Sequence, residues 1–224
     1  VLANEYDDEI AAAYRKNHPE TKMVVGDITA LDLENTFGVF SGKIEVIIGG
    51  PPCQGFSQKG QRKTIHDERN FLFKYYVKVV DLVRPRYFVM ENVPNLLTAE
   101  NGYFQKEIID LFNGMGYSLN AGVLNAADYG VPQNRRRAVI IGKRDGEAPA
   151  LPIKTGQRVT IWDAIGDLAY LESGEGQEEQ QYAELPASDY AKSLRGDMCV
   201  LHNHGATKQS KLALERLALI PQKF

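Results

Sequence analysis

The chain has 224 residues, with 26 Lys or Arg against 29 Asp or Glu, and therefore a formal net charge of −3. Hydrophobic residues make up 43% and charged residues 25%, as in an ordinary globular protein, which excludes a disordered chain or a fibre. No stretch approaches the roughly 20 apolar residues of a membrane-spanning helix. Two cysteines exclude a disulfide framework and favour a reducing compartment. The mildly acidic balance argues against coating of nucleic acid by bulk charge but leaves room for a local basic cleft.

Short apolar runs alternate with helical patterns over the first 143 residues. Strands are predicted at residues 1–3, 23–25, 45–48, 87–90, 117–124 and 138–142. Helices are predicted at residues 7–17, 71–83 and 103–115. This alternation indicates an α/β fold with a doubly wound, mostly parallel sheet, in which ligands bind beyond the carboxyl ends of the strands.

The composition changes near residue 145. Residues 146–156 are rich in Pro and Gly and form a predicted boundary loop. Residues 173–181 are polar and low in complexity, which predicts a mobile surface segment. Trp162 is expected in the core, and residues 210–220 are predicted to form a final short helix.

A first polar cluster, Pro51 to Ser57, follows a predicted strand and contains Cys53. A lone cysteine is more often a small buried hydrophobe than a reactive group. Cys53, however, leaves a strand after two prolines and before a glycine, in a loop too polar for a core. Backbone N–H groups at such a strand end stabilise a thiolate, so Cys53 is a candidate nucleophile.

Two further clusters border predicted strands. Glu91 ends a strand of Tyr, Phe, Val and Met, and such apolar surroundings would favour the protonated form of its carboxyl group. Alone, a surface glutamate at a strand end would be the simpler interpretation. In the run from Gln133 to Arg137, Arg135 and Arg137 fall on one side if a strand begins here. A solvated basic segment is the usual interpretation of such a run.

Together the three clusters resemble the C5-cytosine DNA methyltransferases, in which a Pro-Cys-Gln loop, a Glu-Asn-Val strand end and a Gln-x-Arg-x-Arg segment occur in this order. The resemblance extends from residue 1 to about residue 220. It implies the Rossmann-like fold of class I S-adenosylmethionine-dependent methyltransferases. Residues 1–145 would then be an incomplete catalytic domain, and residues 146–224 a linker and helical segment leading toward a target-recognition domain.

The resemblance also implies a chemical role for each cluster. Carbon 5 of cytosine is a poor nucleophile until a thiolate adds to carbon 6, and Cys53 would make that attack. Glu91 would protonate N3, and Arg137 would hold O2. Arg135 would orient the loop or neutralise a phosphate. The target base must leave the duplex, because none of these groups can reach it inside the helix.

Double-stranded DNA is the implied partner. The loop that follows Cys53 is locally basic, and in the family this region closes over the DNA. The residues implied in DNA binding are Gln54, Ser57, Lys59, Arg62, Lys63 and Gln133.

S-adenosyl-L-methionine is the implied methyl donor. Acidic residues after the second strand commonly bind ribose hydroxyls in this type of sheet. By the resemblance, the strand at residues 1–3 corresponds to the family's second strand, and Glu5 follows it. Such a residue would equally suit a dinucleotide dehydrogenase, so alone it is a weak signal. Tyr6 would stack on the adenine, and Asp27 would accept from its amino group. The full set implied in donor binding is Glu5, Tyr6, Asp27, Ile28, Pro52 and Leu72.

The family's Phe-x-Gly-x-Gly loop and its target-recognition region have no counterpart here. The sequence is therefore expected to be an excerpt, or a chain whose missing motifs come from a complementary polypeptide. No metal site is expected, since Cys199, His202 and His204 lack a second pair of ligands. The resemblance favours the bacterial cytoplasm, at the nucleoid and in a restriction–modification setting, or the nucleus of a eukaryote.

Three alternatives remain open at this point. A related enzyme on the same scaffold methylates cytosine in tRNA, and the three clusters do not separate the two substrates. A methyltransferase-like subunit could bind DNA or a partner without catalysis. A cysteine hydrolase would need a base for Cys53, for which His66 is the nearest candidate in sequence.

Overall fold

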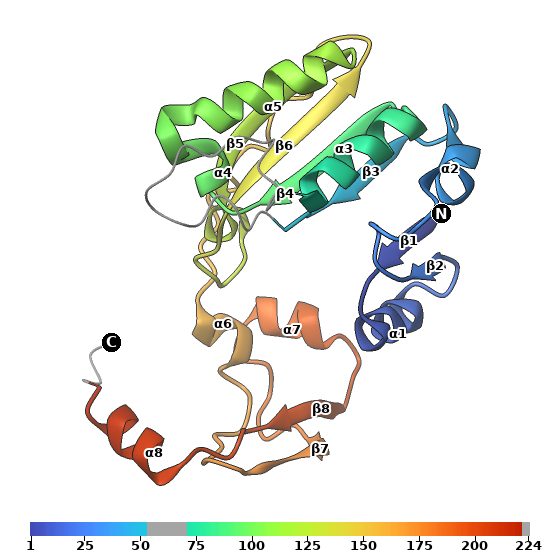
Figure 1. The fold of residues 1–224 in the computed structure, drawn as a ribbon. Coiled ribbons are helices and arrows are strands. Elements are labelled where there is room, and N and C mark those ends of the chain that lie inside the picture. The colour runs from blue at the N-terminus through green and yellow to red at the C-terminus, as the bar shows by residue number, and fades with distance from the viewer. Residues whose placement is uncertain (53–70, 221–224) are drawn as a thin grey trace. The chain divides into compact units, whose positions relative to one another are not determined.

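The computed structural model describes residues 1–52 and 71–220 (Figure 1). These residues divide into two compact units. The first contains Val1–Asn125 and Arg135–Ile153, and the second contains Ala126–Asn134 and the chain from Lys154 onward.

The first unit alternates strands and helices, as predicted. Its N-terminal elements are β1 (Leu2–Glu5), α1 (Asp8–Asn17), β2 (Lys22–Val25), α2 (Leu33–Thr36) and the 3-10 turn η1 (Gly38–Phe40). The remaining elements are β3 (Val46–Gly49), α3 (Phe71–Val83), β4 (Tyr87–Asn92), α4 (Asn95–Thr98), η4 (Ala99–Gly102), α5 (Tyr103–Gly114), β5 (Tyr117–Asn125) and β6 (Arg136–Arg144). The α/β fold class is confirmed, and each strand and helix predicted before residue 143 is present within a few residues of its expected bounds.

The strands form two sheets, β1-β2 and β3-β4-β6-β5. The β1–β2 and β3–β4 pairs are parallel. Strand β6 lies between β4 and β5 and is antiparallel to both. Strands β3, β4 and β5 therefore run in one direction, which agrees with the predicted mostly parallel sheet, and β6 alone is reversed.

The core of the first unit lies between the four-stranded sheet and helices α3 and α5, which cover one face of it (Figure 1). On β4 the residues Phe88 and Met90 are fully buried, as the twofold alternation of a strand requires. The Phe88 ring stacks on Phe112 of α5 with a centroid distance of 4.3 Å. Tyr117 is also buried, and its hydroxyl donates to the Pro85 carbonyl at 2.7 Å. Burial raises the pKa of Tyr117, so this donor stays protonated.

Strands β1 and β3 each have one edge that bonds to no strand in the described part of the chain. On β3, the side chains of Val46 and Ile48 are 43% and 76% exposed. Parallel strands are normally buried on both faces, so exposed apolar side chains on β3 are unusual.

The second unit contains α6 (Ile161–Ile165), β7 (Gly176–Gln181), α7 (Asp189–Arg195), β8 (Val200–Gly205) and α8 (Lys211–Ala218). Polar contacts hold much of it together. Arg195 lies 3.6 Å from the buried carboxylate of Asp167, and its guanidinium lies 3.4 Å from the centroid of the Tyr182 ring. A charge as buried as Asp167 requires such a partner.

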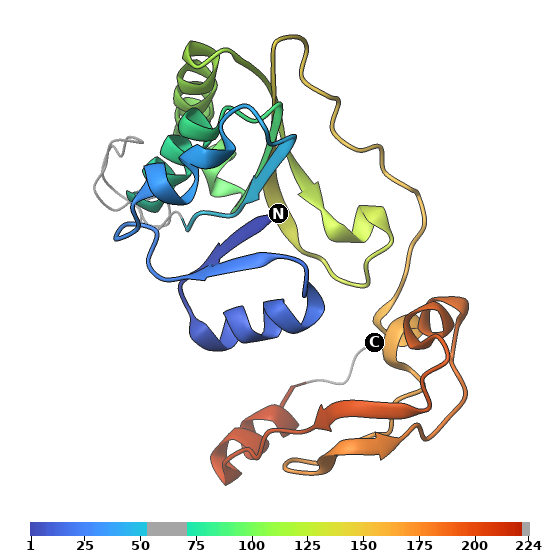
Figure 2. The same cartoon turned by 90° about the vertical axis from the view of Figure 1, so that its right-hand side faces the viewer.

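One expectation for this second unit was wrong and another held only in part. Residues 173–181 lie at the surface, as expected, but residues 176–181 form strand β7, which pairs with β8 in an antiparallel ribbon, coloured orange and red in Figure 2. Backbone hydrogen bonds join β7 to β8 although the side chains of β7 are polar, and the composition of a segment does not reveal such pairing. Trp162 is 72% exposed rather than in the core. In the described part of the chain, no helix is long and apolar enough to cross a membrane.

The packing of Phe88 generates a prediction about Gly142. This glycine lies directly opposite Phe88 in the neighbouring strand β6. A Cβ atom at residue 142 would overlap the Phe88 ring. We expect Gly142→Ala to lower the free energy of unfolding by about 1–3 kcal/mol, the usual cost of overpacking a core.

Urea denaturation of the purified chain measures this effect. Gly114→Ala is the control, because a Cβ there meets no described atom within 4 Å and alanine favours a helix. Equal stability of the Gly142→Ala variant and the parent chain would contradict the packing described.

Candidate active site

The carboxyl end of β4 lies beside the beginning of β6. Glu91 pairs in register with Val139, and Asn92 with Ala138. Because β6 is antiparallel to β4, the residues at and just before its start lie next to the last residues of β4. This brings Arg135 and Arg137 to Glu91, although more than 40 residues separate them in sequence.

Glu91 forms ion pairs with both arginines. The Arg137 Nε atom lies 2.7 Å from Glu91 Oε1, and Arg135 Nη2 lies 3.8 Å from the same oxygen. The Glu91 side chain is 46% exposed, against 28% for Arg137. Its surroundings are therefore polar, not apolar as the composition of β4 indicated. The reason is that alternate residues of a strand point to opposite faces, so Glu91 points away from the core that Phe88 and Met90 enter.

The segment that follows β3 faces this charged group. The Asn92 Nδ2 atom donates to the Pro51 carbonyl at 2.8 Å. A Cβ on Gly50 would lie 3.4 Å from Glu91 Oε2, so the backbone there passes close to the carboxylate. A bulky side chain at residue 50 would occupy the space next to Glu91, and glycine leaves that space open.

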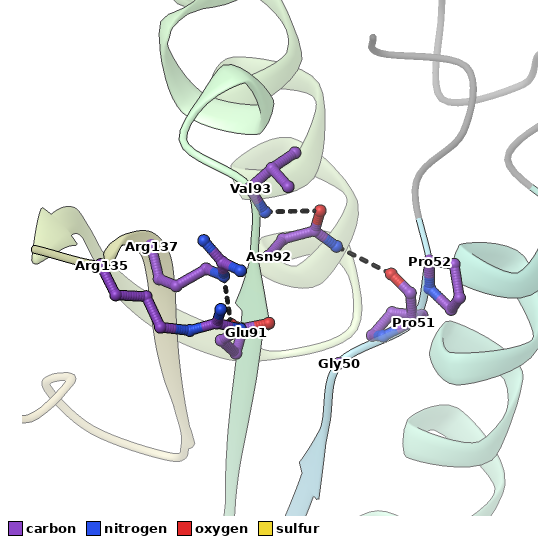
Figure 3. Close-up of a pocket in the computed structure, with 8 residues that line it drawn as sticks. All are labelled: Gly50, Pro51, Pro52, Glu91, Asn92, Val93, Arg135 and Arg137. Carbon is purple, nitrogen blue, oxygen red and sulfur yellow. Dashed lines mark hydrogen bonds and ion pairs between the residues drawn. The ribbon is translucent and has the colours of Figure 1, made fainter. Parts of the chain in front are cut away.

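These segments enclose a pocket of about 270 Å³ (Figure 3). The side chains of Glu91, Arg135 and Arg137 meet at one side of it, and the backbone from Gly50 to Pro52 forms the other. The lining residues are Gly50, Pro51, Pro52, Glu91, Asn92, Val93, Arg135 and Arg137.

Part of the predicted site lies outside the described residues. This applies to the predicted nucleophile and to most of the predicted DNA contacts: Cys53, Gln54, Ser57, Lys59, Arg62 and Lys63. Pro52, which immediately precedes Cys53 in the chain, lines the pocket. Gln133 is exposed in the loop between β5 and β6, and its backbone N–H donates to the Val131 carbonyl at 2.8 Å.

Three of the predicted donor-binding residues, Glu5, Tyr6 and Asp27, lie at the carboxyl ends of β1 and β2. Glu5 ends β1, and its Oε1 accepts from the backbone N–H groups of Tyr6 and Asp7 at 2.8 and 3.1 Å. The Tyr6 ring is 74% exposed, as a stacking surface must be. Because β1 and β2 are parallel and Glu5 lies opposite Val25, Asp27, which follows β2, lies at the same end of the sheet as Glu5.

Asp27 has the properties of a hydrogen-bond acceptor. The backbone N–H of Thr29 donates to Asp27 Oδ1 at 2.8 Å, and this bond, with the Thr29 hydroxyl, lowers the pKa of Asp27. The carboxylate is therefore ionised at neutral pH. Ile28 is half-buried against a second hydrophobic cluster around Phe37, and Leu72 is half-buried in the first turn of α3. Glu5, Tyr6 and Asp27 thus provide an acidic side chain, an exposed ring and an ionised acceptor at one end of the sheet. This set fits the ribose and adenine of S-adenosyl-L-methionine.

The arrangement around Glu91 fits recognition of a planar, polar ring edge. A carboxyl group can donate or accept at a ring nitrogen, and a guanidinium donates to a carbonyl oxygen beside it. Asn92 was not singled out from the sequence as a site residue. A signal for it is present in the sequence: Asn92 lies two residues after Met90 and four after Phe88, so it shares their face of the strand, and a polar residue on a core-facing side is unusual.

The described residues contain no cluster of three or more His, Cys, Asp or Glu side chains arranged to hold a metal ion. Cys199 is exposed. His202 Nδ1 lies 3.5 Å from Glu179 Oε1, and His204 Nε2 lies 2.8 Å from the Ala169 carbonyl, so the two histidines have separate partners.

Comparison with known proteins gives a family match over most of the chain. The model of the C-5 cytosine-specific DNA methylases matches residues 1–209. The chain is 42% identical to the Type II methyltransferase M1.HphI of Haemophilus parahaemolyticus over 179 residues, which are 78% of the chain and 48% of that protein. It is 42% identical to M.XorII of Xanthomonas oryzae pv. oryzae, covering 88% of the chain and 48% of that protein. Similarity to M.DdeI of Desulfomicrobium norvegicum is 35% identity, over 98% of the chain and 55% of that protein.

Solved structures show the same fold. A DNA modification methyltransferase encoded within an E. coli prophage superimposes with a TM-score of 0.69 at 24% identity, over 97% of the chain and 68% of that protein. This likeness supports the class I methyltransferase architecture expected from the sequence. The chain spans about half the length of the curated relatives it matches.

Proposed function

The chain belongs to the C-5 cytosine-specific DNA methylase family, and we propose that it supplies the catalytic residues for methyl transfer to carbon 5 of cytosine in DNA. One observation carries the proposal. Glu91, Arg135 and Arg137 converge in a pocket whose other wall is the segment that leads into Cys53.

The proposed reaction begins with the Cys53 thiolate. Its sulfur forms a bond to carbon 6 of the cytosine. The electron pair of the 5,6 double bond then forms a double bond between carbons 4 and 5, and the pair of the double bond between carbon 4 and N3 moves onto N3, next to O2. Glu91 donates a proton to N3, while Arg137 donates hydrogen bonds to O2. Carbon 5 then has the electron density of an enamine and can form a bond to a methyl group.

S-adenosyl-L-methionine, the donor of this family, supplies an activated methyl group, with S-adenosylhomocysteine as the leaving group. The remaining steps reverse the activation. A base removes the proton from carbon 5, the bond between sulfur and carbon 6 breaks, and the N3 proton returns to Glu91. The target base enters the pocket after leaving the duplex, because a stacked base cannot reach Glu91 and Arg137 together.

We assign the donor site to the carboxyl ends of β1 and β2. Glu5 would bind the ribose hydroxyls, Tyr6 would stack on adenine, and Asp27 would accept from the adenine amino group. The exposed Tyr6 ring and the ionised Asp27 support this assignment. Ile28, Pro52 and Leu72 would supply apolar contacts around it.

Double-stranded DNA is the proposed substrate and partner. The basic residues Lys59, Arg62 and Lys63, with Gln54, Ser57 and Gln133, would contact it. Similarity to Type II methyltransferases supports DNA over tRNA and supports a restriction–modification setting for the proposed enzyme. The bacterial relatives support a location in the cytoplasm at the nucleoid. A methyltransferase-like subunit without catalysis, and a cysteine hydrolase, have no comparable support.

The first prediction concerns the nucleophile. In the enzyme that contains this chain, Cys53→Ser should abolish methylation and covalent trapping of DNA that carries 5-fluorocytosine, because the serine hydroxyl is far less nucleophilic than a thiolate. Cys199→Ser should retain both activities, since Cys199 lies exposed in the second unit. Gel analysis of the trapped complex gives the answer, and equal loss in the two variants would refute the assignment of Cys53.

The second prediction concerns Glu91. Glu91→Gln keeps the shape of the side chain and removes its ionisable proton, so turnover should fall about 100–1000-fold while donor affinity changes little. Glu45→Gln is the matched control: Glu45 Oε1 also accepts from an arginine, Arg86, at 2.9 Å, but it precedes β3 rather than lining the pocket. Near-normal turnover in Glu91→Gln would exclude the proton-donor role.

A complementary segment is a further part of the proposal. The open edges of β1 and β3 and the exposed Ile48 support an additional strand and helix from elsewhere in the protein or from a second polypeptide. The glycine loop that the family uses for the methionine part of the donor would belong to this segment.

The third prediction follows from those open edges. Residues 1–224 alone should bind S-adenosyl-L-methionine weakly or not at all in a calorimetric titration, and should not methylate DNA. Adding the complementary segment, in cis or as a separate chain, should restore both. Micromolar donor binding by the chain alone would show that the residues at β1 and β2 suffice for the donor site.

A further inference from the structure

The parallel pairing of β3 with β4 stops before β4 does. The two strands are in register from Val46 opposite Tyr87 to Gly49 opposite Met90. Strand β4 continues to Asn92, whereas β3 is followed by Gly50 and two prolines. Proline has no backbone N–H, so Pro51 and Pro52 cannot donate to a continued ladder. The backbone alone therefore gives the chain before Cys53 no regular pairing to β4.

The side chain of Asn92 provides a link at this point. Its Nδ2 atom donates to the Pro51 carbonyl at 2.8 Å, and its Oδ1 atom accepts from the Val93 backbone N–H at 2.9 Å (Figure 3). The second bond fixes which end of the amide faces Pro51. Asn92 is only 5% exposed, so both bonds are formed by a side chain that is largely shielded from water.

Asn92 lies between the two walls of the pocket. It directly follows Glu91, which points to the opposite face of β4, and it bonds to the wall that leads into Cys53. The 3.4 Å separation between a Cβ on Gly50 and Glu91 Oε2 shows how closely the two walls approach. A shift of the Pro51 segment would change the distance between the proposed acid and the proposed nucleophile.

We propose that Asn92 is a positioning residue for the methyl transfer: its amide holds the Pro51–Pro52 segment at a fixed distance from Glu91. This inference rests on the proposed function. In it Asn92 acts on the reaction through its hydrogen bond to Pro51. Misplacement of reacting groups by about 1 Å can cost on the order of 100-fold in rate, so one buried hydrogen bond can have a large effect on chemistry and a small effect on binding.

The test uses Asn92→Asp and Asn92→Ala in the enzyme that contains this chain. Aspartate keeps the acceptor for the Val93 N–H but, when ionised, turns an oxygen toward the Pro51 carbonyl oxygen. We expect the single-turnover methylation rate of both variants to fall about 100-fold, with dissociation constants for donor and DNA within about threefold of the parent. Asn120→Asp is the matched control, because Asn120 Nδ2 also donates to a proline carbonyl, that of Pro149, at 3.4 Å, and does not line the pocket.

A pH profile separates positioning from a general structural role. A protonated aspartate can again donate to Pro51, so the rate of Asn92→Asp relative to the parent should rise as the pH falls. A ratio independent of pH, or a parental rate in Asn92→Ala, would overturn the proposal. Thermal unfolding of each variant is measured alongside, and a rate loss that only parallels loss of folded protein would also overturn it. An inactive parent enzyme would instead refute the proposed function itself.

Discussion

The antiparallel pairing of β6 with β4 is the constraint on which the site depends. Had β6 run parallel to its neighbours, its first residues would lie at the opposite end of the sheet from Glu91. Reversal places the arginines at the carboxyl end of β4, and the register of Asn92 with Ala138 sets Arg137 within 2.7 Å of Glu91. The ladder that fixes this contact is made of buried residues such as Ile140, so the geometry of the charged group is determined by the core behind it.

The two walls of the pocket differ in how firmly they are held. A continuous backbone ladder joins Glu91 to β6, and ladders of this kind resist local shifts because many hydrogen bonds must change together. The wall from Gly50 to Pro52 has left its ladder, and Asn92 provides a side-chain link to it. The two walls are therefore held by different kinds of contact, a backbone ladder at Glu91 and a side-chain hydrogen bond at Pro51.

The sequence predicted the first unit better than the second for a physical reason. Strands such as β4 begin with a short run of apolar residues, which is visible in the sequence. Strand β7 contains Glu, Gln and Gly and is held by backbone bonds to β8, a partner about 20 residues away, so side-chain chemistry did not reveal it. Trp162 was expected in the core, but it lies in the short helix α6 and is 72% exposed.

Within the site, the sequence indicated which residues meet but not how they are solvated. The common side of Arg135 and Arg137 follows from strand alternation, and both do reach one carboxylate oxygen. The polar surroundings of Glu91 depend on which face of β4 turns away from the helices, and composition cannot supply that. The role inferred for Asn92 depends on where β3 stops pairing, which only the register reveals.

The electrostatic character of the site is set by the charged groups that line the pocket and not by the net charge of the chain. The net charge of −3 would repel a polyanion at long range, yet the pocket carries two guanidinium groups for one carboxylate. Screening at physiological ionic strength acts over about 8 Å, so charges elsewhere on the surface contribute little at this distance scale. Arg137 is the less exposed of the two arginines and Arg135 the more exposed, at 28% and 52%. This difference supports the proposed division of roles, in which Arg137 would hold the base within the pocket and Arg135 would orient the loop or neutralise a phosphate.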